Sequence, residues 1–275
     1  MSGATLVRQV LDERAVPLAL RSRLVLGVAS LAGLMMLCWP LLVQVPAGGG
    51  GRTDPPFLFL LLLPLVIAVV IAEISEGGMD SRVLAILGVL SAVNALMRLL
   101  SAGTAGVELV FFLLILSGRV FGAGFGFVLG VTSLFASALL TAGVGPWLPF
   151  QMICAAWVGM GAGLLPRRVA GRWEIAMLAA YGVLASYLFG MLMNLSGWPF
   201  LLGVSVPGAE GNLSYIAGAP LLENLQTFVV YSLITSTGSF DTGRAITTAV
   251  AVIVLGPSVL TTLRRASRRA LVLAG

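Results

Sequence analysis

Few residues of this chain could act chemically on another molecule, and they gather at the ends of apolar runs. The stretch GVGPWLPFQM, residues 143–152, places prolines, aromatic rings and an amide between two such runs. Pro149 would fall in the first turn of a helix, where the missing N–H of a proline breaks no helical hydrogen bond. Trp147 and Phe150 offer flat apolar surface beside the Gln151 amide, a combination typical of an apolar pocket with a few orienting polar groups. The stretch therefore predicts a turn that caps a pocket for a small solute, although Trp147 could also serve only as an interfacial belt residue.

Other polar side chains lie close to the ends of the predicted helices. Arg98 follows Asn94 by one helical turn, and Glu108 comes ten residues later. Polar groups at membrane depth normally face the interior of a bundle, which makes them candidates for function. Arg98 and Glu108 could bind a solute or could clamp a short loop as an ion pair. Three further amides could contact a solute or tie down loop backbone: Asn194, Asn224 and Gln226.

Several kinds of chemistry lack the residues they need. The chain has no His and no Lys, and its only cysteines, Cys38 and Cys154, lie in apolar runs. The chain therefore lacks the residues needed for Ser-His catalysis, for the commonest zinc ligand and for the lysine of a P-loop. The sequence GAGFGF at 122–127 lacks the preceding strand and the later acidic residue of a dinucleotide site. We therefore expect no catalytic residues, no metal, no cofactor and no enzymatic activity.

The composition is that of an integral membrane protein. Hydrophobic residues make up 59% of the 275 residues and charged residues 10%, and the mean hydropathy is +1.05. Soluble domains are nearer half apolar and a quarter charged. Apolar runs long enough to cross about 30 Å of hydrocarbon predict eight spans. They lie at about 24–44, 57–75, 82–101, 105–118, 121–142, 148–165, 173–195 and 243–263.

The arginines predict the sidedness of these spans. All sixteen basic residues are Arg, mostly at the ends of apolar runs, which favours topology signals over nucleic-acid binding. If the arginines before residue 24 are cytoplasmic, then Arg82, Arg119, PRRVAGR (166–172) and RRASRR (264–269) share that side, provided that 221–237 does not cross the membrane. We therefore expect both termini in the cytoplasm and an outer or re-entrant helix over 221–237.

Small residues recur at helical spacing and predict close helix packing. One stripe is Gly122, Gly126 and Gly130, and a second is Ala155, Gly159 and Gly163. In lipid, small faces let helices approach closely, so internal packing is the expected role of these two stripes. A third stripe, which could pack internally or dock onto a partner helix, is Gly88, Ala92 and Ala95.

The stretch from VFFLLILSGRV to GMGAGLL, residues 110–165, resembles the substrate-binding (S) component of energy-coupling factor (ECF) vitamin transporters. GPWLPFQM followed by GMGAGLL is its most specific part, and the resemblance extends over about 81–269. The actinobacterial cobalamin-type members are the most similar. The resemblance implies six spans, a vitamin bound from outside, and delivery to a membrane coupling (T) subunit with two cytoplasmic ATPases. Family members dock through small residues on their first span, here 82–101, although the present stripe departs from two alanines four residues apart.

These observations predict an all-α, multi-pass protein of the plasma membrane. Its divisions would be an N-terminal tail with an extra pair of transmembrane helices (1–80), a six-span body (81–269) and a short tail (270–275). The expected function is solute binding for an ABC-type importer, with a vitamin, cobalamin favoured, the transporter subunits and membrane lipid as partners. The alternatives are a self-sufficient carrier or channel and, less favoured, a membrane-embedded enzyme.

Overall fold

The computed structural model is an all-helical bundle, as expected from the composition. It describes residues 20–42, 58–76, 79–101, 106–200, 213–216 and 218–272. The α-helices are α2 (Leu20–Leu37), α3 (Trp39–Leu42), α4 (Leu58–Glu76), α5 (Ser81–Ser101), α6 (Val110–Phe121), α7 (Ala123–Leu140), α8 (Leu148–Leu164), α9 (Arg172–Gly197), α10 (Leu221–Ser232) and α11 (Thr242–Val272). A 3-10 turn, η1 (Trp198–Phe200), follows α9, and a π-helix, η2 (Leu233–Asp241), joins α10 to α11.

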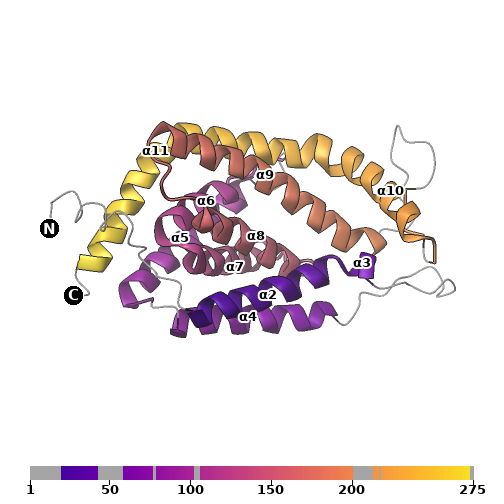
Figure 1. The fold of residues 1–275 in the computed structure, drawn as a ribbon, viewed down its shortest axis with the longest axis horizontal. Coiled ribbons are helices and arrows are strands. Elements are labelled where there is room, and N and C mark those ends of the chain that lie inside the picture. The colour runs from indigo at the N-terminus through magenta and orange to yellow at the C-terminus, as the bar shows by residue number, and fades with distance from the viewer. Residues whose placement is uncertain are drawn as a thin grey trace.

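The eight predicted spans all correspond to apolar helices. Within the described residues, five helices are long and apolar enough to cross a membrane, in the ranges 20–37, 81–99, 123–140, 172–200 and 221–269. Shorter apolar helices cover 65–75, 110–121 and 148–164. Figure 1 shows that α2 begins and α11 ends at the same end of the bundle, so the described chain crosses it an even number of times.

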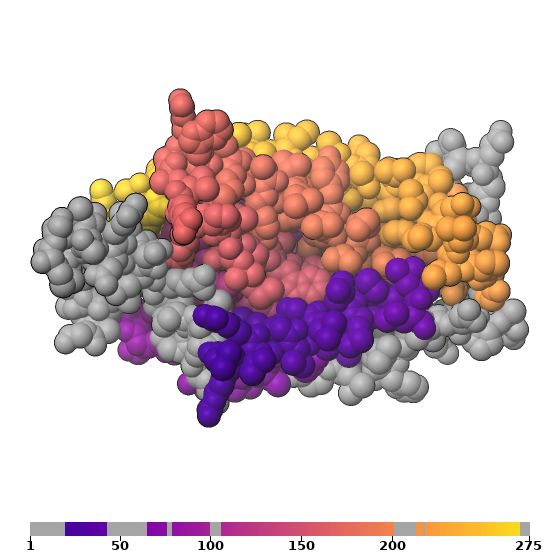
Figure 2. Space-filling model, in the orientation of Figure 1, coloured from indigo at the N-terminus to yellow at the C-terminus, as the bar shows by residue number. Residues whose placement is uncertain are grey.

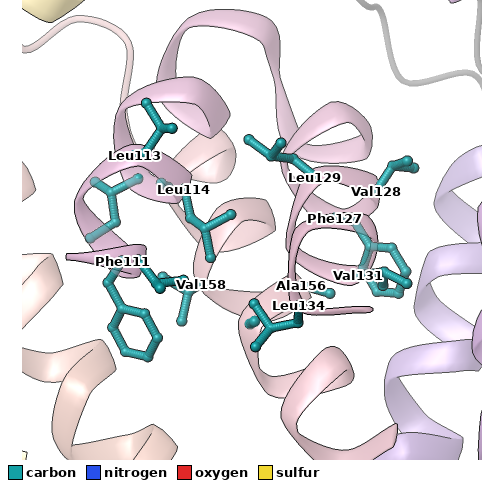
Figure 3. Close-up of a cluster of buried hydrophobic side chains, with 14 of the residues drawn as sticks. Phe111, Leu113, Leu114, Phe127, Val128, Leu129, Val131, Leu134, Ala156 and Val158 are labelled. Atoms are coloured by element: carbon teal, nitrogen blue, oxygen red, sulfur yellow. The ribbon is translucent and has the colours of Figure 1, made fainter. Parts of the chain in front are cut away.

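The core is built by α6, α7 and α8. Every residue of α6 is buried, so this short helix is enclosed by the other helices. Large apolar side chains of α6, α7 and α8 gather in Figure 3, among them Phe111, Leu114 and Phe127, and all of them belong to the buried core. Dispersion contacts and close packing stabilise such a core, because lipid supplies little hydrophobic driving force between helices.

The two glycine stripes pack against each other in this core, which confirms their predicted role. A Cβ atom on Gly126 would collide with the backbone carbonyl of Gly159, and a Cβ on Gly159 would collide with that of Gly126. One turn further along α7, a Cβ on Gly130 would lie 2.5 Å from the Cα of Ala156. The backbones of α7 and α8 therefore touch directly, which only glycine allows at these positions.

The turn between α6 and α7 lies later than the gap predicted between the spans 105–118 and 121–142. α6 continues to Phe121, and the turn is made by Gly122, whose φ of 109° is disfavoured for residues with a side chain. Arg119, which was expected at the membrane surface, is therefore inside the helix and only 7% exposed. The predicted end of this span at 118 was too early, because the apolar run alone does not show where a helix ends, but Arg119 does contact the arginine-rich loop after α8.

The N-terminal helices pack along one side of the later ones. In Figure 2, α2 lies on the molecular surface below α9. The indole nitrogen of Trp157 in α8 donates to Ser30 Oγ over 3.0 Å, and that of Trp39 donates to the Ser196 carbonyl over 3.1 Å. The Trp39 ring also stacks on Phe200 at 5.4 Å between centroids. α2 and α3 are thus joined to α8, α9 and η1 by specific contacts as well as by apolar surface.

The segment 221–237 does not turn back on itself. α10, η2 and α11 follow one another without a break, and the apolar helical stretch runs over 221–269. At about 1.5 Å per residue this stretch is roughly 70 Å long, more than twice the hydrocarbon thickness. Of the two forms expected for 221–237, the structure excludes the re-entrant one. The segment extends the last span instead of adding a crossing.

Candidate functional site

A hydrogen bond joins two of the predicted site residues. Arg98 lies in the last turn of α5 and Gln151 in the first turn of α8. The Nη2 atom of Arg98 donates to Oε1 of Gln151 over 2.9 Å, and both side chains are half-buried. The bond brings an arginine and an amide from two different helices to the same end of the bundle. This end lies opposite the arginine-rich loop 166–172.

Arg244 in the first turn of α11 adds two ion pairs nearby. Its Nε donates to Glu108 Oε2 over 2.5 Å, and its Nη1 donates to Asp241 Oδ1 over 3.0 Å. The guanidinium also lies over the Phe189 and Phe111 rings, 4.8 and 5.5 Å from their centroids. A cation held between carboxylates and aromatic faces is stabilised even where water is scarce.

Asp241 is the most enclosed member of this group, at 1% exposure. Ser236 Oγ donates to its Oδ2 over 2.8 Å. Its carboxylate occupies the space beside Gly190 of α9 where a side chain would otherwise lie. Asp241 ends the π-helical segment η2, and π-helical turns recur at functional sites.

The two arginines belong to one group of charges. Arg98 lies in the last turn of α5 and Arg244 in the first turn of α11, and these two helices contact each other. We call the group formed by Arg98, Glu108, Gln151, Asp241 and Arg244 the Arg98 cluster. The two cations and two carboxylates of the cluster balance in formal charge. Ionisable groups within or close to membrane-spanning segments usually mark a functional site.

Asn94 lies one turn before Arg98 and has an unpaired acceptor. Its Nδ2 donates to Ser133 Oγ over 3.0 Å, but its Oδ1 is buried without a hydrogen-bond partner. The Ser137 hydroxyl, one turn beyond Ser133 on α7, is buried and unpartnered as well. A buried polar atom without a partner is costly and calls for an explanation such as a bound molecule.

The structure separates the aromatic residues of the predicted turn. Trp147 is 52% exposed, and its ring covers Gly145. Phe150 is 1% exposed and belongs to the core. Trp147, Phe150 and Gln151 therefore do not line one pocket together, because successive residues of a helix start point in different directions.

The other three predicted amides serve different roles. Asn194 Nδ2 donates to Ser232 Oγ over 2.9 Å and links α9 to α10. Asn224 accepts from the Ile216 N–H and donates to the Ile216 carbonyl, which fixes loop backbone. Gln226 is exposed on α10. None of the three contacts the Arg98 cluster through a bond that the structure describes.

The third small-residue stripe is divided between two environments. Gly88 and Ala92 are exposed, and a Cβ on Gly88 would meet nothing within 4 Å. Ala95 is 1% exposed. Of the three predicted docking residues, Ala95 is thus buried by the chain itself, while Gly88 and Ala92 present an open, small-residue face.

Arg244 and Asp241 were not predicted as site residues, and Arg244 is an ion-pair partner of Glu108 that the sequence did not indicate. The ion pair of Glu108 that the structure describes is with Arg244, 136 residues later in the chain. One signal was available: Arg244 lies at the beginning of the last predicted span, 243–263, where an unpaired charge is unfavourable.

A second group of charges lies at the arginine-rich end. Arg119 Nε and Arg264 Nη2 both donate to Glu174 Oε1, over 2.7 and 2.6 Å. Arg119 also donates to the carbonyls of 165, 166 and 169. We call Arg119, Glu174 and Arg264 the Glu174 cluster. It ties α6, α9 and α11 to the loop after α8.

Metal ligands do not gather in the described part of the chain. No group of three or more His, Cys, Asp or Glu side chains lies close enough together there to hold an ion.

Comparison with known proteins gives one match. The family described as ECF transporter, substrate-specific component, matches residues 82–273, from the first turn of α5 to beyond the end of α11. No curated protein and no solved structure was found to match the chain.

Proposed function

Because the chain belongs to the family of substrate-specific components of ECF transporters, we propose that it binds a vitamin from outside the cell at the Arg98 cluster. Membership makes it a membrane subunit that serves a small solute and works with the coupling and ATPase modules of an ECF importer. This family consists of transporter components and not of enzymes. The proposal adds the place of binding, the direction and the class of solute.

The observation that carries the proposal is the convergence of polar groups from five separate segments. Arg98 comes from α5, Glu108 from the segment before α6, Gln151 from α8, Asp241 from η2 and Arg244 from α11. A structural ion pair would need only two of these segments. The buried, unpartnered Asn94 Oδ1 beside them is an acceptor that a solute donor could satisfy.

The residues would bind the solute with different groups. Arg98 supplies a planar set of N–H donors suited to carbonyl, carboxylate or phosphate oxygens. Gln151 uses its carbonyl oxygen on Arg98, so its NH₂ group is the donor it can offer. Asn94 Oδ1 supplies an acceptor. The Arg244 ion pairs hold the elements around the site in place.

Cobalamin is the specific vitamin we propose. Its support is the resemblance of 110–165 to cobalamin-type members, above all in GPWLPFQM. Trp147, exposed at the turn beside α8, would contact such a large ligand at the rim. Delivery would then proceed through docking of the open Gly88 and Ala92 face onto the coupling subunit.

The sidedness follows from the arginines. Arg82, the loop 166–172 and the stretch 264–269 all lie at one end of the bundle, and the positive-inside rule places that end in the cytoplasm. The Arg98 cluster then faces outward, and both termini are cytoplasmic.

Purification from cells that accumulate cobalamin tests this function. The protein should retain one corrinoid per chain, detected by absorbance and by mass spectrometry, and Arg98→Gln should lose it while remaining monodisperse. Retention of a different vitamin would overturn only the choice of cobalamin and would leave the proposed binding function in place. Solute uptake into liposomes containing only this protein would favour a carrier, and turnover of a solute by the isolated protein would favour an enzyme.

A further inference from the structure

A cleft opens at the arginine-rich end, far from the Arg98 cluster. Its volume is about 450 Å³, and it lies between the first turn of α9 and the second half of α11. Pro257 lacks an N–H and bends α11 here, and Figure 1 shows this helix changing direction toward its end. The lining consists of Gly171, Arg172, Glu174, Ile175, Pro257, Leu260 and Arg264.

The charges around this cleft leave an excess of positive charge. Glu174 is the one carboxylate in the lining, and its Oε1 already accepts from both Arg119 and Arg264. Arg172 has no carboxylate within ion-pair distance among the described residues. Two arginines thus line the cleft beside one carboxylate that is already shared with the buried Arg119, which favours an anion in the cleft.

The cleft lies at the boundary between lipid and water. The membrane-length stretch of α9 begins at Arg172. Trp173 is 66% exposed, and the Arg172 guanidinium lies over its ring at 5.6 Å. Exposed tryptophans and arginines at the end of a span are typical of the headgroup region.

We propose that this cleft binds one anionic phospholipid. The phosphate contacts Arg172 and Arg264, and the beginning of the acyl chains lies on Ile175, Pro257 and Leu260. An apolar wall next to two cations suits an amphiphile better than a free inorganic anion, and the opening at the headgroup level gives lipids direct access. The site is independent of the solute site.

Arg172→Gln is the variant that tests the proposal most directly, because Arg172 belongs to neither cluster. The purified protein would be reconstituted in phosphatidylcholine nanodiscs with added phosphatidylglycerol. Native mass spectrometry would then count the lipids that stay bound when the protein is released from the nanodisc. We expect one phosphatidylglycerol retained by the unmodified protein and roughly fivefold weaker retention in the variant. Arg264→Gln should weaken retention similarly. The matched control is Arg268→Gln, an exposed arginine of α11 outside the cleft, which should change little.

Four results would overturn the proposal. The first is equal retention of phosphatidylcholine and phosphatidylglycerol. The second is an equal loss in Arg172→Gln and Arg268→Gln, which would indicate a diffuse surface effect. The third is displacement of the lipid by millimolar inorganic phosphate, which would indicate a free-anion site. If Arg172→Gln instead reduces association with the coupling subunit at unchanged lipid retention, the cleft binds an acidic protein segment and the proposal is wrong.

Discussion

The Arg98 guanidinium and the Gln151 amide meet over 2.9 Å and connect the end of α5 to the beginning of α8. If the proposed site is correct, Gln151→Leu should weaken cobalamin binding at least tenfold. The change removes an acceptor of Arg98 and a donor to the solute, and a hydrogen bond to a charged group contributes about 1.5–3 kcal/mol. Isothermal calorimetry on the purified protein would measure this. Gln226→Leu is the matched control, because Gln226 is exposed on α10 and should leave the affinity unchanged. Equal affinities for both variants would remove Gln151 from the site.

The Glu174 cluster should dominate the stability of the arginine-rich end. Glu174→Ala leaves Arg119 buried without a carboxylate, and breaking a buried ion pair in this way costs about 3–5 kcal/mol. Arg264→Ala should cost much less, since its side chain is 47% exposed and Arg119 keeps its partner. Thermal unfolding in detergent would rank the two variants. A similar effect of both would contradict a shared, buried carboxylate.

The contact between α7 and α8 predicts a large effect from a single methyl group. Gly126→Ala would press a Cβ atom into the Gly159 backbone and should destabilise the protein by about 1–3 kcal/mol. Gly27→Ala provides the control, because a Cβ on Gly27 meets nothing within 4 Å. The midpoint of thermal unfolding should fall for the first variant only. If Gly126→Ala unfolds at the same temperature as the unmodified protein, the two backbones are not in contact.

The small-residue face of α5 allows folding and assembly to be separated. Ala92→Trp should keep solute binding and abolish uptake, because Ala92 is exposed and proposed to dock onto the coupling subunit. Ala95→Trp should instead prevent folding, since Ala95 is 1% exposed. Binding assays and copurification with the coupling subunit would distinguish them. Normal copurification of Ala92→Trp would show that docking uses another surface.

The sidedness can be tested with two cysteines on one continuous helix. In a Cys38→Ser background, Gln226→Cys should react with an impermeant maleimide from outside intact cells, and Arg268→Cys only after lysis. Both positions are exposed, whereas the native Cys154 is buried. The reverse pattern would place the Arg98 cluster in the cytoplasm and refute uptake from outside.

Hydrophobic patterning predicted the helices well, because span length and apolarity are local properties. The packing of the two small-residue stripes on α7 and α8 was equally predictable, since a spacing of four residues places small residues on one face of a helix. Helix ends were less predictable. Arg119 resembled a loop residue because nothing near it in the chain reveals Glu174, which lies 55 residues later.

The candidate site was predictable only in part for the same reason. Asn94, Arg98 and Gln151 were identified from their types and positions at helix ends. The partners of Arg244 depend on how α11 lies against the segment before α6, a contact between residues far apart in sequence. The burial of Phe150 in the core was not predictable, because the sequence does not show toward which neighbour a residue of the first helical turn points.

Arg244 and Arg264 are both carried by α11, and each is held by a carboxylate from a different part of the chain. The helix between them spans about 30 Å, which is also the depth of the hydrocarbon layer. If α11 moved along its axis by one turn, the guanidinium of either Arg244 or Arg264 would shift into the hydrocarbon layer. With the two ion pairs at opposite surfaces of the hydrocarbon layer, bilayers much thinner or thicker than this separation should disturb one pair before they disturb the core.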